Sequence, residues 1–254
     1  MQISFNRTAC SRKIEYIVIH DTGNKSKGAN ASAHFKYFNG GNRNASADFF
    51  VDDTGSYKVN DYTKYYTWHC GDGYGRYGIT NVNSIGIEIC VNADGDYAKA
   101  FENAAALTKE LMLELNIPIN NVVRHYDASR KNCPASMSAD NWSKWKVFKK
   151  MLKFESPEEV VQALQRRGII TNHALWSAKC IYNSNSYWLA YKVANQTTNH
   201  ARGAILSSVN DIVWELGHRG IITDKALWLS LLEEDKNLYW LAYKCANMTT
   251  NLPS

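Results

Sequence analysis

The chain has 254 residues, of which 45% are hydrophobic and 21% are charged. This composition excludes a chain that is disordered throughout, and the length suits two modules better than one. The formal net charge of +5 favours anionic surroundings, such as cell-wall polymers or nucleic acid, without selecting between them. No stretch approaches the roughly 20 apolar residues of a membrane span, and the N-terminal segment lacks the pattern of a signal peptide. We therefore expect synthesis in the cytoplasm and release only by a separate route.

Strand and helix patterns alternate up to residue 153. Short apolar or β-branched runs predict strands at residues 14–19, 49–51, 56–59, 84–91 and 121–126, and the sequence DDTG forms a hairpin turn between the second and the third. Leucines at helical spacing predict a helix over 100–116, and an apolar stripe with a lysine-rich opposite face predicts another over 142–153. His34, in a further helical stretch, is expected at the surface, with a place near the groove as the alternative. The alternation predicts a layered α/β domain covering residues 1–153.

The remaining residues, 154–254, contain a tandem repeat. RGIIT at 167–171 recurs at 219–223, and YWLAYK at 187–192 recurs at 239–244, each at an offset of 52 residues. Repetition at this period indicates two copies of one structural unit, at about residues 156–203 and 207–254.

Each copy carries signals for its own helices. Ser156 and Ser208 stand where a helix N-cap is expected, and Gly168 and Gly220 stand where a left-handed residue would end that helix. Tryptophans and Tyr-Trp pairs fall on two further helical segments. We therefore predict a small all-α domain of two three-helix repeats, with most tryptophans in the core and any exposed aromatic rings free to stack on sugars.

Six cysteines lie at positions 10, 70, 90, 133, 180 and 245, without Cys-x-x-Cys spacing. We expect reduced thiols, five of which act as small core residues. Cys133 differs because His125 and Lys131 precede it and Pro134 follows it. A chain that places His20 and His125 at the ends of separate strands can bring both to Cys133 at one edge of a sheet.

Two imidazole nitrogens and one sulfur leave a fourth position for water, which is the ligand pattern of catalytic zinc. The same residues allow two other interpretations. A histidine at a strand end is often only a satisfied polar residue. Alternatively, Cys133 as nucleophile and His125 as base would make a thiol hydrolase.

Five motifs narrow these choices: IVIHDTG, SADFFVDDTG, WHCGDG, NSIGIEI and HYDASRKNCP, in that order. Over about residues 10–150 the chain resembles type 2 N-acetylmuramoyl-L-alanine amidases, the family that includes many phage endolysins and the animal peptidoglycan recognition proteins. The resemblance implies an α/β fold with a mixed central sheet flanked by helices. It also implies Zn²⁺ bound by His20, His125 and Cys133, and hydrolysis of the amide between N-acetylmuramic acid and L-alanine of peptidoglycan.

The resemblance also implies roles for residues around the metal. Glu88 matches the catalytic glutamate of several bacterial and phage members, and Lys131 matches a lysine that stabilises the oxyanion. Trp68 and His69 match a Trp-His motif beside the groove, where we expect substrate contacts, or proton handling by His69, and no metal ligation. Ala47 stands where some phage members carry a catalytic tyrosine, which places more weight on Glu88.

The repeats resemble, more loosely, helical cell-wall-binding regions of some clostridial phage endolysins. We therefore expect an endolysin that degrades Gram-positive walls, with peptidoglycan as its partner and neither nucleic acid nor a stable membrane association. Self-association through the repeats is an alternative role for them. A non-catalytic peptidoglycan-binding protein is the main rival for the whole chain, although such proteins typically lack the cysteine ligand.

Overall fold

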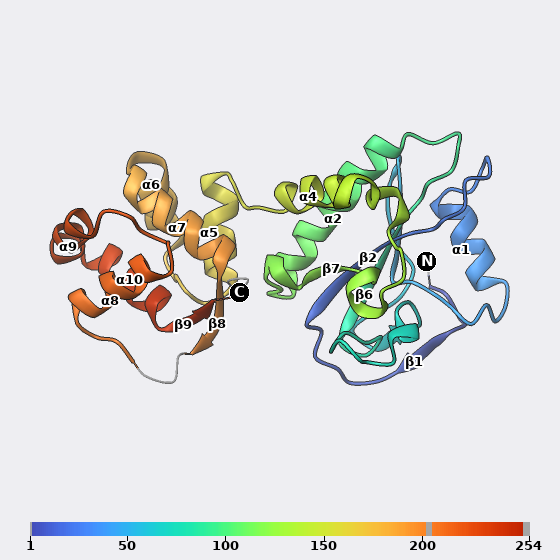
Figure 1. The fold of residues 1–254 in the computed structure, drawn as a ribbon, viewed down its shortest axis with the longest axis horizontal. Coiled ribbons are helices and arrows are strands. Elements are labelled where there is room, and N and C mark those ends of the chain that lie inside the picture. The colour runs from blue at the N-terminus through green and yellow to red at the C-terminus, as the bar shows by residue number, and fades with distance from the viewer. Residues whose placement is uncertain (1, 202–204, 251–254) are drawn as a thin grey trace. The chain divides into compact units, whose positions relative to one another are not determined.

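The computed structural model describes residues 2–201 and 205–250. The chain divides into two compact units, Met1–Leu152 and Lys153–Ser254 (Figure 1). Within the described part of the chain, no helix has both the length and the apolar composition needed to cross a bilayer.

The first unit is built on a five-stranded sheet with the order β4-β3-β6-β2-β7. The hairpin partners β3 (Phe49–Asp52) and β4 (Gly55–Lys58) are antiparallel. The other pairs are parallel and join β3, β6 (Ser84–Ile89), β2 (Tyr16–Asp21) and β7 (Val122–Arg124). This confirms the predicted mixed sheet. A second, two-stranded sheet pairs β1 (Arg7–Ala9) with β5 (Tyr65–Thr67), which the sequence patterns did not predict.

Helices cover both faces of the five-stranded sheet (Figure 1). Helix α1 (Ala31–Asn39) lies on one face, and α2 (Tyr97–Glu114) and α4 (Ala139–Met151) lie on the other. The short α3 (His125–Ser129) follows β7 directly. The described residues of this unit also form three single-turn 3₁₀ helices: η1 (Gly71–Gly73), η2 (Ile119–Asn121) and η3 (Ala135–Met137).

Strand register decides which side chains face α1. His20 pairs with Glu88, and Glu88 pairs with Phe50, so these three side chains form a row on one face of the sheet. Helix α1 packs on this face, because Phe38 and His34 both stack on Phe50, with ring centroids 5.4 and 5.5 Å apart from it. The expectation of a surface His34 was wrong. The helix turns its imidazole inward onto Phe50, and His34 is 8% exposed.

The second unit contains six helices within its described residues, three in each repeat. The first repeat has α5 (Pro157–Arg166), α6 (His173–Tyr182) and α7 (Ser184–Gln196), and the second has α8 (Val209–His218), α9 (Lys225–Glu234) and α10 (Lys236–Ala246). Strand β8 (Thr197–Ala201) follows the three helices of the first repeat and pairs antiparallel with β9 (Met248–Thr250), which follows the three helices of the second. The sequence patterns did not predict this strand pair.

The predicted N-cap serines and helix-ending glycines have these roles in both repeats. The side chains of Ser156 and Ser208 accept hydrogen bonds from the backbone of their first helical turns. Gly168 and Gly220 follow the first helix of each repeat with φ of +65° and +64°, a conformation that glycine adopts without steric cost.

The same side-chain contacts also recur in both repeats. Asn195 and Asn247 each bond both the N–H and the C=O of the residue 41 positions before them, Phe154 and Leu206 respectively. Each asparagine therefore ties the end of its repeat to the segment just before the first helix.

Candidate active site

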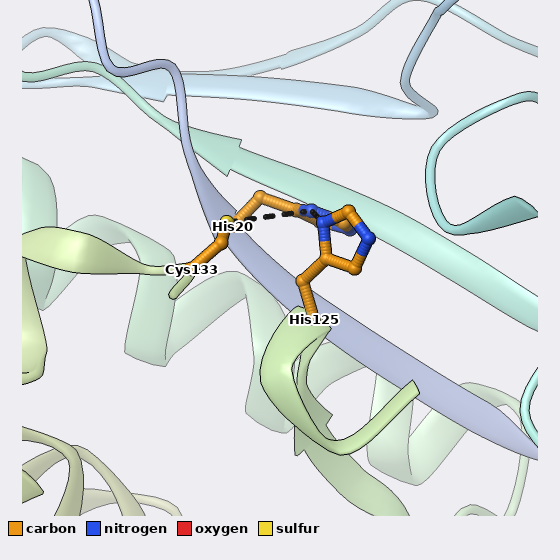
Figure 2. Close-up of side chains that lie close together, drawn as sticks. All are labelled: His20, His125 and Cys133. Carbon is orange, nitrogen blue, oxygen red and sulfur yellow. Dashed lines mark hydrogen bonds between the residues drawn. The ribbon is translucent and has the colours of Figure 1, made fainter. Parts of the chain in front are cut away.

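The three expected ligand residues converge at the edge where the parallel strands end (Figure 2). His20 is the penultimate residue of β2, His125 is the first residue of α3, and Cys133 lies in the loop between α3 and η3. The strand predicted over 121–126 is therefore shorter than expected, because α3 begins at the histidine. The Nδ1 atoms of His20 and His125 are 3.1 Å apart, and Cys133 Sγ is 3.8 Å from His20 Nδ1. All three donor atoms lie within 4.8 Å of one another.

The chemistry of these donors suits a metal ion. All three side chains are buried, and burial lowers the pKa of His20 and of His125, so both imidazoles are neutral and keep a lone pair. Burial also raises the pKa of the Cys133 thiol to about 12, and a nearby cation favours the thiolate instead. Nitrogen, nitrogen and sulfur donors in this arrangement are typical of zinc.

Glu88 lies beside the ligands because β6 pairs with β2 in register. Its Oε1 is 3.9 Å from His20 Nδ1, and among the described residues its Oε2 has no hydrogen-bond partner. Burial, with a smaller contribution from the charge of Asp21, raises the pKa of Glu88 to about 8, and the charge of Lys131 opposes this shift. A buried carboxyl group with a pKa near neutrality is suited to transferring protons.

Two cavities flank this group of residues. The first, of about 440 Å³, is lined by Glu88 and by residues of α1 and β3, including His34 and Phe50. The second, of about 310 Å³, is lined by His125 and Lys131, together with Trp68, His69 and others. The carboxylate and the lysine expected to act in catalysis therefore face different cavities, and His125 is the candidate ligand that also lines the second.

The Trp-His pair divides between surface and interior. Trp68 is 38% exposed, and its indole N–H donates to Thr8 Oγ1 over 3.1 Å. His69 is buried, with its Nδ1 3.1 Å from His20 Nε2. Trp68 thus has the accessible surface that substrate binding needs, whereas His69 is buried with one ring nitrogen against a candidate ligand.

Sequence reasoning missed Asp72. This residue lies in η1, and its Oδ1 is 2.7 Å from His125 Nε2. The only signal in the sequence was its place in the glycine-rich stretch WHCGDG, which by itself does not indicate which side chain the loop would approach.

Comparisons with known proteins identify the family of the first unit. A family model described as N-acetylmuramoyl-L-alanine amidase matches residues 11–136. The solved structure of the catalytic domain of XlyA is 43% identical in sequence and has a TM-score of 0.52. The match covers 58% of this chain and 91% of that one. The chain belongs to the type 2 N-acetylmuramoyl-L-alanine amidase family. A second solved structure, of a mutant endolysin from Bacillus subtilis, is 40% identical with a TM-score of 0.52; the match covers 59% of this chain and 99% of that one.

Two curated members of the amidase family are also similar in sequence to about half of this chain. N-acetylmuramoyl-L-alanine amidase CwlH of Bacillus subtilis (strain 168) is 44% identical over 138 residues, which are 54% of this chain and 54% of CwlH. N-acetylmuramoyl-L-alanine amidase XlyA of the same organism is 44% identical over 145 residues, which are 56% of this chain and 46% of XlyA. The chain thus spans about half the length of these amidases.

Proposed function

We propose that the protein hydrolyses the amide bond between N-acetylmuramic acid and L-alanine in peptidoglycan, with zinc bound by His20, His125 and Cys133. The observation that carries this proposal is the buried group of three metal-type donors beside Glu88, in a chain of this family. The endolysin among the similar structures supports a role in degrading the walls of Gram-positive bacteria.

The chain's own residues supply the proton transfers. Zinc bound by the three ligands would supply a Lewis acid that polarises the amide carbonyl and lowers the pKa of water to about 7. Glu88 accepts a proton from the water while the oxygen of that water attacks the carbonyl carbon. It then gives this proton to the nitrogen of L-alanine as the C–N bond breaks.

Lys131 supplies positive charge close to the residues that would bind the metal and transfer the proton. It lies in the loop just before Cys133, and its charge acts on the pKa of His20, Glu88 and His125. An ammonium group at this position stabilises the negative oxygen of the tetrahedral intermediate. Because Glu88 and Lys131 line different cavities, a substrate whose scissile bond lies between them can extend its sugar and peptide parts in opposite directions.

The structure does not favour the thiol hydrolase. The hydrogen-bond contact of Cys133 Sγ is with His20 Nδ1, whereas this alternative requires His125 as the base. Burial raises the pKa of the Cys133 thiol to about 12, whereas a nucleophilic cysteine needs a lowered pKa.

Digestion of purified Gram-positive peptidoglycan tests the activity. We expect new N-terminal L-alanine without new reducing sugar ends, loss of this release in a metal chelator, and its return with added zinc. Glu88→Gln is the matched control for contaminating hydrolases, and it should release almost none. New reducing ends, or release that persists in chelator, would overturn the proposed reaction or its metal dependence.

We further propose that the second unit binds the cell wall through its repeated aromatic side chains. Trp188 and Trp240 occupy equivalent positions and are 45% and 52% exposed. Each stacks on a tyrosine of its own helix, and a lysine lies near the ring. Flat exposed indoles of this kind suit sugar faces, and two weak sites on one insoluble polymer gain by avidity.

Sedimentation with purified walls tests this second proposal. Replacing Trp188 and Trp240 together by Ala should leave most of the protein in the supernatant. Trp214→Ala is the control, because Trp214 is 57% exposed but has a glutamine, Gln162, at the equivalent position of the first repeat. Equal sedimentation of the double variant and the control would contradict a role for the paired indoles.

A further inference from the structure

A chain of hydrogen bonds leads from the interior of the first unit to His20. Ser84 Oγ donates to the carbonyl oxygen of Thr80 over 2.5 Å, so towards His69 Nε2, 3.2 Å away, it acts as an acceptor. The single N–H of a neutral His69 is therefore on Nε2, and its Nδ1 accepts from His20 Nε2 over 3.1 Å. His20 in turn carries its proton on Nε2, which leaves a lone pair on the Nδ1 that faces the other donors.

Asp72 acts on the second histidine in the same way. An ionised carboxylate only accepts hydrogen bonds, so the 2.7 Å contact places the proton of His125 on Nε2. The Nδ1 atom of His125 then also carries a lone pair. Two nitrogen lone pairs 3.1 Å apart repel each other unless a cation lies between them, so these outer hydrogen bonds prepare both rings for a metal.

Two glycines allow these contacts. A Cβ atom at Gly86, in the middle of β6, would lie 2.6 Å from Cγ of His69, so the imidazole occupies the space of the missing side chain. A Cβ atom at Gly73 would lie only 2.0 Å from the carbonyl oxygen of Ala128 in α3. Gly73 therefore lets η1, which carries Asp72, pack against the helix that begins with His125.

We propose that His69 and Asp72 are positioning residues that fix the tautomers of His20 and His125, so that both present Nδ1 to the metal. They thereby set the affinity for zinc. This inference rests on the proposed metal centre, and it gives His69 a role other than substrate contact. Outer groups that orient ligating histidines typically change metal affinity by about 10–100-fold when they are removed.

The test compares two substitutions of equal shape at His69. In His69→Asn the amide oxygen lies near the position of Nδ1 and still accepts from His20, whereas in His69→Leu that acceptor is missing. Zinc affinity is measured by competition with a chromophoric chelator, starting from metal-free full-length protein. We expect His69→Leu to bind zinc about 10–100-fold more weakly than His69→Asn. With cobalt in place of zinc, the absorption from the Cys133 thiolate should differ between His69→Leu and His69→Asn. Without metal, these two variants should unfold at similar temperatures.

Asp72 provides a second pair that does not depend on a buried substitution, because its side chain is 48% exposed. Asp72→Asn keeps an oxygen acceptor for His125, and Asp72→Leu removes it. We expect the Leu variant again to bind zinc more weakly than the Asn variant, by about tenfold. This pair decides the proposal if a His69 variant does not fold.

The outcomes separate the two proposals. Equal zinc affinity within each Asn and Leu pair would overturn the positioning role while leaving the metal centre intact. Failure of the unaltered protein to bind zinc would overturn the metal centre and this inference together.

Discussion

Replacing Glu88 by Gln should raise stability, because a buried charge is removed, and should abolish activity, because the amide cannot accept the proton of the water. Burial raises the pKa of Glu88 from 4.5 to about 8 in the metal-free protein. A shift of this size corresponds to an upper limit of about 5 kcal/mol of lost stability when the carboxyl group is ionised. The side chain keeps 20% exposure, so we expect a difference of about 2–3 kcal/mol.

The sign of the pH dependence follows from proton binding. Between the ordinary pKa of 4.5 and the raised value of about 8, the unfolded chain has lost the Glu88 proton while the folded chain retains it. The free energy of unfolding therefore falls as pH rises through this window. Glu88→Gln has no proton to lose there. Its stability advantage over the unaltered protein should grow from about pH 5 to about pH 8.

Thermal unfolding in chelator, across this pH range, measures the difference. For a unit of this size, about 2–3 kcal/mol corresponds to roughly 4–12 °C at the upper end of the window. The metal-loaded variant should meanwhile lose about 10²–10⁴-fold in hydrolysis rate. Parallel pH profiles for the two proteins would refute the burial argument, and a near-normal rate would remove Glu88 from the mechanism.

Three further predictions concern the ligands, the oxyanion and the second unit. Cys133→Ser should lose both bound zinc and hydrolysis, which metal analysis of the purified variant measures; full activity would contradict the ligand assignment. Lys131→Ala should keep its zinc but lose about 10²–10³-fold in turnover, and an unchanged rate would show that this ammonium does not meet the oxyanion. A chain ending at Leu152 should still cleave soluble peptidoglycan fragments but sediment poorly with intact walls; unchanged sedimentation would contradict the proposed anchor.

Much of the first unit was predictable because its signals are local. The apolar run before His20 and the DDTG turn each act within a few residues, and the observed β2 and the β3–β4 hairpin agree with them. The end of the last strand was less clear, because a strand pattern continues into His125 while the capping contacts of Arg124 and Asp127 start a helix there. Capping depends on side-chain geometry that periodicity does not capture.

The site was predictable only in part. The three donors follow from motifs, but the partners of His20 and His125 come from positions 49 and 53 residues away in the chain. The burial of His34 was also not predictable, since its helical pattern does not indicate that the ring would stack on Phe50. Contacts of this kind depend on how elements pack, which one sequence without its fold does not specify.

The asparagines at the end of each repeat have a consequence for modular design. Asn195 and Asn247 close their repeats with hydrogen bonds to segments 41 residues earlier, and each copy also has its own N-cap serine and its own left-handed glycine. The caps and the closing asparagine are therefore encoded separately for each copy, whereas the pairing of β8 with β9 joins the two copies. Under the proposed wall-binding role, a third copy added to the array is expected to raise wall avidity.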